Sequence, residues 1–374
     1  MPLIVTTLLT SVTHLRSGWS RRMAVGAAAY WITTTLLAAT LGLVLVLSIK
    51  PGAHAVSEED AVYEQNFSTV HAFMDLVRNA VPRNLILASM EHYKTAVVVD
   101  EQHLETNATQ VRRSGQYVEG INPLGLMVWS YAFALVLNRL REDMGPLVVV
   151  ITAIHEFLKI VVDAVLGWFP VGVLFIVIRC VIEVQDWETA FCYAKFLAVV
   201  LLGLVIQGTC LSLAWSLVMR HHPGVFIKSY FPALKTAFLS SSSSAALPLT
   251  LRCRVERLLG KREVTRFILT VGTNVNAHGT ALYLVVAAVF VAQLAHIHLG
   301  IGQLSTMVVT SAVLSAGAAG VPTTGSTMTF FVLAASGLPV KETLVLVIIE
   351  WILDRFNTVI NMMGNCLGVE LVSW

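Results

Sequence analysis

Three stretches in the second half of the sequence place polar and helix-breaking residues inside apolar segments. They are LSSSSSAALP at 239–248, VGTNVNAHGT at 271–280 and SAGAAGVPTTGS at 315–326. Backbone that leaves helical geometry at membrane depth is tolerated only where protein or a water-filled cavity satisfies its N–H and C=O groups. Such freed carbonyls, with nearby amide side chains, suit a cation or a small polar substrate. A polar packing seam between helices explains a single interruption, but three interruptions favour a binding site.

The composition places these stretches in a polytopic membrane protein. Hydrophobic residues make up 56% of the 374 residues, charged residues make up 13%, and the mean hydropathy is +0.74. These values lie outside the range of soluble domains. Apolar segments that approach the ~20 residues needed to cross a bilayer are expected at 24–49, 122–138, 146–178, 194–219, 264–299, 304–336 and 343–369.

The same sequence argues against several other classes of protein. A net charge of +2 without a concentrated basic surface argues against nucleic acid as a partner. No catalytic triad, phosphate-binding loop, metal-ligand cluster or dinucleotide fingerprint is present, so the sequence does not indicate an enzyme. We therefore expect no cofactor, and no metal beyond a coupling ion.

Charged residues and glycosylation acceptors set the expected topology. Basic residues precede the first complete span and follow the next one, namely Arg16, Arg21, Arg22, Arg139 and Arg141. The positive-inside rule places both groups in the cytoplasm, so the acidic loop 51–120 faces outward. Acceptor motifs at Asn66 and Asn107 in this loop predict glycosylation and a plasma-membrane location. Two apolar segments interrupted by Ser, Gly and Pro, 224–250 and 301–337, predict re-entrant hairpins, one in each half of an inverted repeat.

Four segments resemble, in order and spacing, the signature segments of the excitatory and neutral amino-acid transporters, the dicarboxylate/amino acid:cation symporter family. They are SSSSAALPLT (241–250), VGTNVNAHGTALY (271–283), GAAGVPTTG (317–325) and LDRFNTVINMMGN (353–365). The resemblance continues upstream through YWITTTLLAATLG (30–42), HAFMDLVRNAVPRNL (71–85), NPLGLMVWS (122–130) and WFPVGVLFIV (168–177). It therefore covers essentially the whole chain.

This resemblance implies an all-α, glutamate-transporter-like fold and a homotrimer in the lipid bilayer, each protomer having a static scaffold and a mobile transport domain. Family members have eight membrane segments, so we expect the chain to start near the end of the second one, as a fragment or splice form. The implied parts are remnants of the second and third membrane segments (1–50), the outward loop (51–120), scaffold and middle segments (121–220) and a transport core (221–374).

The resemblance also implies the residues that bind an amino-acid substrate. Asp354 matches the Asp that binds the amino group, and its position inside an apolar segment, where a carboxylate costs about 2.5–3.5 kcal/mol, marks it as functional by itself. Thr358 and Asn361 match residues that contact the substrate and its carboxylate. The implied set is Ser241, Ser242, Ser243, Thr280, Val321, Gly325, Asp354, Asn357, Thr358 and Asn361.

Two departures from the family pattern concern substrate choice. Asn357 stands where transporters of acidic amino acids place an Arg that forks onto the side-chain carboxylate, and an amide offers no charge for that fork. Leu284 stands where those transporters have a Glu for proton coupling. Neutral amino acids are therefore the expected substrates. Arg355 matches an Arg that animal members carry beside the binding Asp.

The sodium positions depart further from the family pattern. The family's Asn-Met-Asp-Gly-Thr appears here with Ala277 and His278, a second carboxylate is replaced by Asn365, and Trp31 replaces a Tyr. Hard cations prefer anionic oxygen, so sodium binding should be weakened. The implied cation set is Thr34, Thr35, Gly272, Asn274, Asn276, His278, Ser315, Asn361 and Asn365.

Two functions remain compatible with these losses. The first is a symporter of neutral amino acids with weakened or altered sodium coupling, in which protonated His278 supplies a tethered cation. The second is a non-transporting relative that acts as a partner subunit, a receptor or an anion channel.

Overall fold

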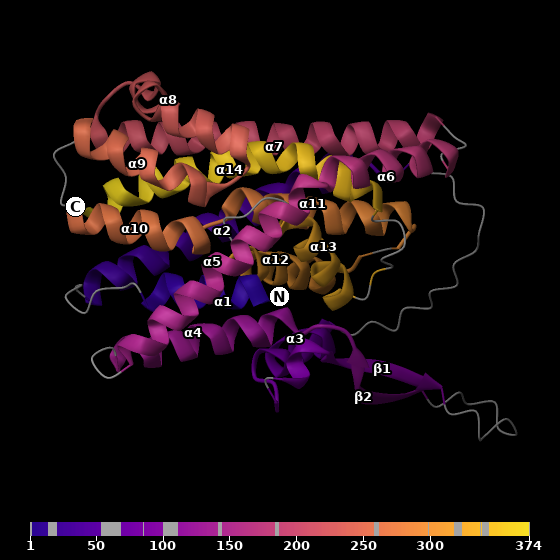
Figure 1. Cartoon of the computed structure of the whole chain (residues 1–374). Coiled ribbons are helices and arrows are strands. Elements are labelled where there is room, and N and C mark those ends of the chain that lie inside the picture. The colour runs from indigo at the N-terminus through magenta and orange to yellow at the C-terminus, as the bar shows by residue number, and fades with distance from the viewer. Residues whose placement is uncertain are drawn as a thin grey trace, which may run out of the picture.

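The structure is a computed structural model in which long helices lie lengthwise beside one another (Figure 1). It describes residues 2–13, 21–53, 69–84, 86–99, 111–140, 144–183, 187–257, 262–297, 299–317, 324–336, 338 and 344–373. The helices of the first half are α1 (Pro2–Thr13), α2 (Arg21–Ile49), α3 (Thr69–Ala80), α4 (Pro123–Arg139), α5 (Gly145–Gly167), α6 (Phe169–Glu183) and α7 (Trp187–Met219). Those of the second half are α8 (Pro223–Ser240), α9 (Ser243–Arg257), α10 (Arg262–Val275), α11 (His278–Leu294), α12 (Ile301–Ser315), α13 (Thr324–Ala335) and α14 (Leu344–Ser373).

Helices dominate because a chain in lipid must satisfy its backbone hydrogen bonds within each segment. Among the described residues, three helical stretches are long and apolar enough to cross a membrane: Met23–Ile49, Ala190–Met219 and Val264–Leu294. The last of these contains the break between α10 and α11. The segment expected at 146–178 is two helices, α5 and α6, which meet at Trp168. Pro170 lies in the first turn of α6, where its missing N–H costs nothing.

Helix α11 forms the centre of the molecule and is buried along almost its whole length. It packs against α2, α7, α12, α13 and α14. The rings of Phe196 on α7 and Phe290 on α11 stack with their centroids 4.7 Å apart. A helix buried on all sides can place polar residues only where neighbouring helices satisfy them. The polar residues at the start of α11, including His278, therefore depend on the neighbouring helices for their hydrogen-bond partners.

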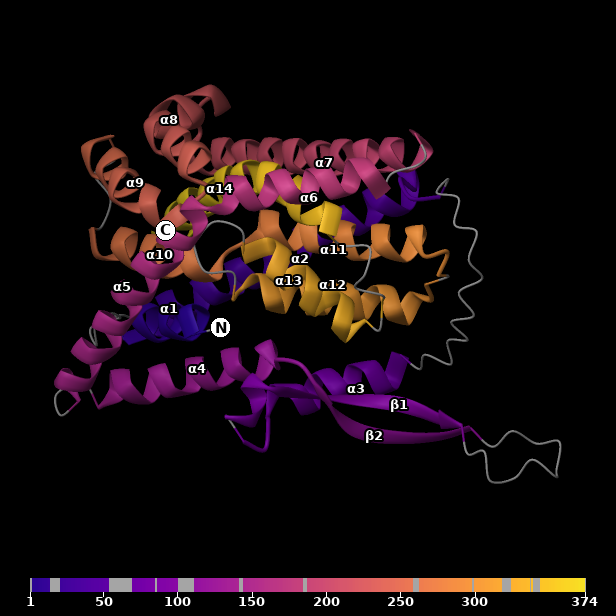
Figure 2. The same cartoon turned by 45° about the vertical axis from the view of Figure 1, so that its right-hand side comes forward.

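The two expected hairpins are present in the described residues and lie toward opposite ends of the helical bundle in both views (Figures 1 and 2). Helices α8 and α9 form the first, and the chain turns at Ser241, whose φ of 49° is left-handed. Helices α12 and α13 form the second, and their connection at 318–323 lies outside the described residues. This arrangement agrees with the expected glutamate-transporter-like fold.

The segment 51–120, predicted to face outward and here called the outward region, contains structure that the sequence did not predict. Strands β1 (Glu91–Val99) and β2 (Val111–Glu119) pair antiparallel, from Glu91 opposite Glu119 to Val99 opposite Val111. A short 3-10 helix, η1 (Leu87–Ser89), precedes β1. The two strands lie beside α3 and project from one edge of the molecule (Figure 2). The glycosylation motifs at Asn66 and Asn107 lie outside the described residues, so glycosylation stays a prediction.

Candidate substrate and ion site

The chain leaves helical geometry at Asn276 and Ala277, between α10 and α11. The Asn276 N–H still donates to the Gly272 carbonyl at 2.8 Å, and Ala277, which has no capping side chain, precedes the first turn of α11. A side chain of α14 supplies the missing cap, because the Gly279 N–H donates to Asn361 Oδ1 at 2.7 Å. The helix break expected from the sequence is thus stabilised by a hydrogen bond from the first turn of α11 to the last helix, α14.

The first group of site residues, here called the ion-side cluster, consists of Trp31, Gly272, Asn276, His278 and Asn365. Asn276 Nδ2 donates to Asn365 Oδ1 at 2.9 Å, and both residues are buried. A Cβ added at Gly272 would lie 2.6 Å from Asn365 Oδ1 and 3.5 Å from the Trp31 ring. Glycine is therefore required for this close approach. Two of the residues expected to bind sodium hydrogen-bond each other.

His278, the last member of this cluster, is fully buried between α7 and α14. Its Nδ1 lies 2.8 Å from Nε2 of Gln207 on α7, so with the amide nitrogen as donor the ring is neutral and carries its proton on Nε2. The ring also lies directly against the Gly364 backbone. Because the N-terminus of a helix disfavours positive charge, these contacts favour a neutral ring over the charged ring expected above.

The second group, here called the substrate-side cluster, consists of Thr280 with Asp354, Asn357, Thr358 and Asn361. The last four lie on one face of α14 because their spacing matches the helical period. Asn361 Nδ2 donates to Thr280 Oγ1 at 3.2 Å, and Thr358 Oγ1 donates to the Asp354 carbonyl at 2.7 Å. Asn357 is buried, and its Oδ1 has no hydrogen-bond partner among the described residues. The cluster thus combines a buried carboxylate with an available amide acceptor.

The first hairpin is fixed to α14 by Arg355. Its guanidinium donates to the carbonyls of Phe238, at 3.5 Å, and Leu239, at 3.2 Å, in the last turn of α8, and lies 5.2 Å from the Trp351 ring centroid. A cation at a helix C-terminus stabilises the carbonyls that have no partner in the helix. Arg355 therefore holds the tip of the hairpin, where Ser241, Ser242 and Ser243 are buried.

The remaining residues expected to bind substrate or cation belong to neither cluster, and their contacts differ. Gly325 on α13 is buried and lies against the Glu350 carboxyl group of α14. Thr34 and Ser315 donate within their own helices, to Tyr30 and Trp31 and to Ala312. Thr35 is buried on α2, and Asn274 Nδ2 lies 3.4 Å from the Thr270 carbonyl. Val321 lies outside the described residues.

Sequence reasoning missed two residues of this region. Gln207 is the hydrogen-bond partner of His278, and Glu350 is a fully buried acid one helical turn before Asp354. Both carry a signal that could have been used, because each is a polar residue inside a long apolar helix. Such residues face a protein interior rather than lipid.

Two oppositely placed hairpins, a helix broken at its polar residues and a buried carboxylate in the last helix together define a membrane transporter. The chain belongs to the sodium:dicarboxylate symporter family, whose model matches residues 1–373. It is therefore a multi-pass membrane protein of a sodium-coupled symporter family and not an enzyme.

Several relatives support this assignment over the full length of the chain. The chain is 38% identical to excitatory amino acid transporter 3 of Oryctolagus cuniculus and of Homo sapiens, covering 75% of each. It is 33% identical to an excitatory amino acid transporter of Caenorhabditis elegans, covering 77% of that protein. The resemblance inferred from the sequence motifs is confirmed. The relatives are named as excitatory amino acid transporters. This chain has Asn357 and Leu284 at the two positions where the sequence departs from transporters of acidic amino acids.

Proposed function

We propose that this chain is a secondary active amino-acid transporter of the plasma membrane, which works as a homotrimer and prefers neutral to acidic amino acids. Its coupling to sodium is weaker than the family pattern implies. The substrate-side cluster binds the amino group at Asp354 and the α-carboxylate through Thr358, Asn361 and the backbone of the first hairpin.

The observation that carries the preference for neutral substrates is the position of Arg355. An acidic amino acid needs a second cationic group for its side-chain carboxylate. Arg355, the cation adjacent to Asp354 in sequence, donates hydrogen bonds to the carbonyls at the end of α8. Its guanidinium therefore does not pair with a substrate carboxylate in this arrangement. Asn357 adds hydrogen-bonding capacity without charge. The described residues of the cluster thus suit one ammonium group but not an additional carboxylate.

The ion-side cluster supports the weaker sodium coupling. Sodium binding would have to compete with the hydrogen bond between Asn276 and Asn365, since the amide nitrogen occupies one lone pair of the Asn365 oxygen. His278 adds a ring nitrogen where the family pattern has an anionic oxygen. A cation in a low-dielectric site depends on such charge, so sodium affinity falls.

The same contacts support the second candidate, a non-transporting relative that acts as a partner subunit, receptor or anion channel. A core whose ion positions are closed by internal hydrogen bonds can keep the fold while losing turnover. The two candidates differ in what crosses the membrane.

Uptake of labelled neutral and acidic amino acids, with and without external sodium, tests the proposal when normalised to surface-labelled protein. Uptake of a neutral amino acid that exceeds uptake of glutamate and responds weakly to sodium is expected. No uptake at normal surface density, together with a chloride current, would support the second candidate instead. Preferred, strongly sodium-dependent uptake of glutamate or aspartate would overturn both statements about specificity and coupling.

A further inference from the structure

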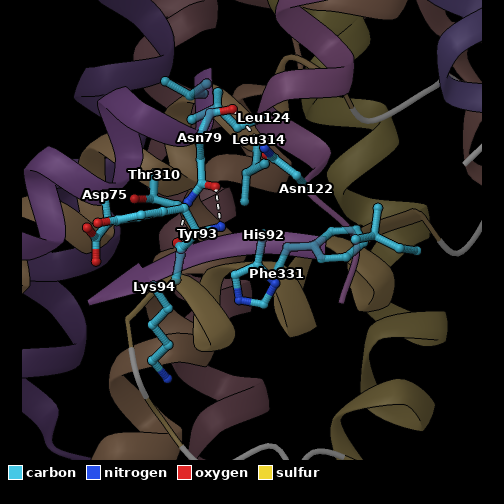
Figure 3. Close-up of a pocket in the computed structure, with 13 residues that line it drawn as sticks. Asp75, Asn79, His92, Tyr93, Lys94, Asn122, Leu124, Thr310, Leu314 and Phe331 are labelled. Carbon is cyan, nitrogen blue, oxygen red and sulfur yellow. Dashed lines mark hydrogen bonds between the residues drawn. The ribbon is translucent and has the colours of Figure 1, made fainter. Parts of the chain in front are cut away.

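A cavity of about 80 Å³ lies away from both clusters, between the outward region and the second hairpin (Figure 3). One wall comes from α3, β1 and the start of α4, and the other comes from α12 and α13. By the usual requirement of about 15 Å³ for each water position, the cavity has room for about five waters. This room admits a small organic ligand, and no member of either cluster lines the cavity.

The first wall is held rigidly by hydrogen bonds. Asn79 accepts from the Tyr93 N–H and donates to the Tyr93 carbonyl, both at 2.8 Å. Asp75 accepts from the N–H and the hydroxyl of Thr95 at 2.7 and 2.6 Å. Asn122 caps α4 and donates to the Asn79 carbonyl at 2.9 Å. These bonds use the carboxylate and amide groups of the wall, so the site is pre-formed.

The charge that this wall presents to a ligand comes from β1. His92 and Lys94 are alternate residues of the strand and extend to the same side of it (Figure 3). Burial lowers the pKa of His92 below its ordinary 6.5; a backbone hydrogen bond to Gly120 opposes this, and the Lys94 charge adds to it. His92 is thus mainly neutral at pH 7. Asp75, the carboxylate that also lines the cavity, is paired with Arg78 at 3.5 Å. Lys94 forms no ion pair with the described residues, so its charge is the one left for a ligand.

The opposite wall is apolar except for one hydroxyl group. Val313, Leu314, Phe331 and Ala335 supply its apolar surface. Thr310 on α12 is 3% exposed, and its Oγ1 has no hydrogen-bond partner among the described residues. A buried hydroxyl without a partner is energetically unfavourable, and a ligand in the cavity would relieve that cost. The Thr310 hydroxyl therefore points to an occupant with a polar group.

We propose that this cavity binds a small amphipathic carboxylate with an aromatic or branched apolar body. The carboxylate pairs with Lys94, the apolar body packs against Leu314 and Phe331, and the Thr310 hydroxyl donates to an oxygen of the ligand. Because the ligand contacts both the outward region and the second hairpin, it restrains one against the other. Binding itself is independent of the proposed transport function, whereas the slowing of uptake that follows from it rests on that function.

Equilibrium binding of labelled phenylacetate to the full chain in lipid nanodiscs tests the proposal. Saturable binding is expected, about tenfold weaker in Lys94→Met and in Thr310→Val, since loss of one such polar contact corresponds to about that factor. Arg83→Met removes an exposed cation of the same region outside the cavity and should leave binding unchanged. Asp354→Asn should also leave it unchanged, even where uptake is lost.

Three results would overturn the proposal. The first is the absence of saturable binding. The second is equal binding to the wild-type chain and to folded Lys94→Met and Thr310→Val variants. The third is displacement of phenylacetate by a transported amino acid. The last would place phenylacetate at the substrate-side cluster. Thermal unfolding of each variant shows whether it is folded, and the Lys94→Arg variant, which keeps the charge, should retain most of the binding.

Discussion

The ion-side and substrate-side clusters both include residues of α14, yet their polar groups are satisfied differently. In the ion-side cluster, Asn365 hydrogen-bonds Asn276, and His278 hydrogen-bonds Gln207. In the substrate-side cluster, Asn357 keeps an oxygen without a partner among the described residues. Neutral side chains can satisfy one another inside a protein, whereas a buried polar atom without a partner costs free energy unless a ligand satisfies it. The difference indicates a core that retains substrate binding more fully than ion binding.

The largest effect is expected from Asp354→Asn, which removes the only carboxylate of the substrate-side cluster. Uptake of every amino acid that the chain transports should fall at least about 100-fold, because losing one partner of a buried charge pair costs about 3 kcal/mol or more. Initial rates at several substrate concentrations measure the change. Uptake that survives this variant would mean that the amino group binds elsewhere.

Asn357→Arg should shift the substrate preference toward acidic amino acids. A guanidinium at this position can fork onto a side-chain carboxylate, and such charge-assisted bonds are worth about 1.5–3 kcal/mol, or about 10–100-fold in the ratio of glutamate to neutral amino-acid uptake. Competition between the two labelled substrates gives the ratio. Asn357→Gln, which extends the side chain without charge, serves as the control. An unchanged ratio in the Arg variant would show that residue 357 does not face the substrate.

Restoring both carboxylates of the ion-side cluster, with His278→Asp and Asn365→Asp together, should confer sodium dependence of about tenfold on uptake, since the ion regains anionic oxygen. The measurement is uptake as a function of sodium concentration. His278→Asn removes the ring without adding charge and should not produce this response. A sodium response identical to that of the original chain would contradict the role assigned to this cluster.

Gly364→Ala should destabilise the protein, because a Cβ at this position would collide with the His278 ring, with its Cδ2 and Cε1 each at 2.8 Å. Overpacking of this kind costs about 1–3 kcal/mol, which thermal unfolding would show as a lower midpoint. Gly26→Ala is the matched control in α2, since nothing lies within 4 Å of a Cβ there. Combining Gly364→Ala with His278→Ala should recover the loss, and failure to do so would place the strain elsewhere.

The smallest expected effect is a change in the stability of the outward region with pH. Unlike both clusters, this region has residues that are partly exposed to water, such as His92. The pKa of His92 lies below its ordinary 6.5, so between that value and the lower folded value the unfolded chain binds a proton that the folded chain does not. Stability of the β1–β2 hairpin should therefore decrease as pH falls below about 6.5. Hydrogen exchange of the β1 amides at pH 7 and pH 5.5 measures this. His92→Gln should abolish the difference, and an equal decrease in that variant would assign it to another group.

Much of the core was predictable from residue types alone. The polar interruptions at 239–248 and 271–280 predicted the hairpin turn at Ser241 and the helix break at Asn276, because Ser and Asn are poor helix formers inside apolar segments. The division of the segment 146–178 into α5 and α6 was not predicted, although Pro170 marked it. The β1–β2 hairpin was missed because strand formation depends more on how the side chains of a strand pack against their neighbours than on local residue preference.

The sequence by itself determined that this protein is a helical membrane transporter of the sodium:dicarboxylate symporter family, and which positions depart from the family pattern. Composition and motif order suffice for this because the bilayer restricts the possible folds so strongly. Only the tertiary structure decided how the departures are accommodated. It brings Asn276 to Asn365, Gln207 to His278 and Arg355 to the end of α8. These partners lie on segments that are far apart in sequence, and their distances depend on packing that no local pattern encodes.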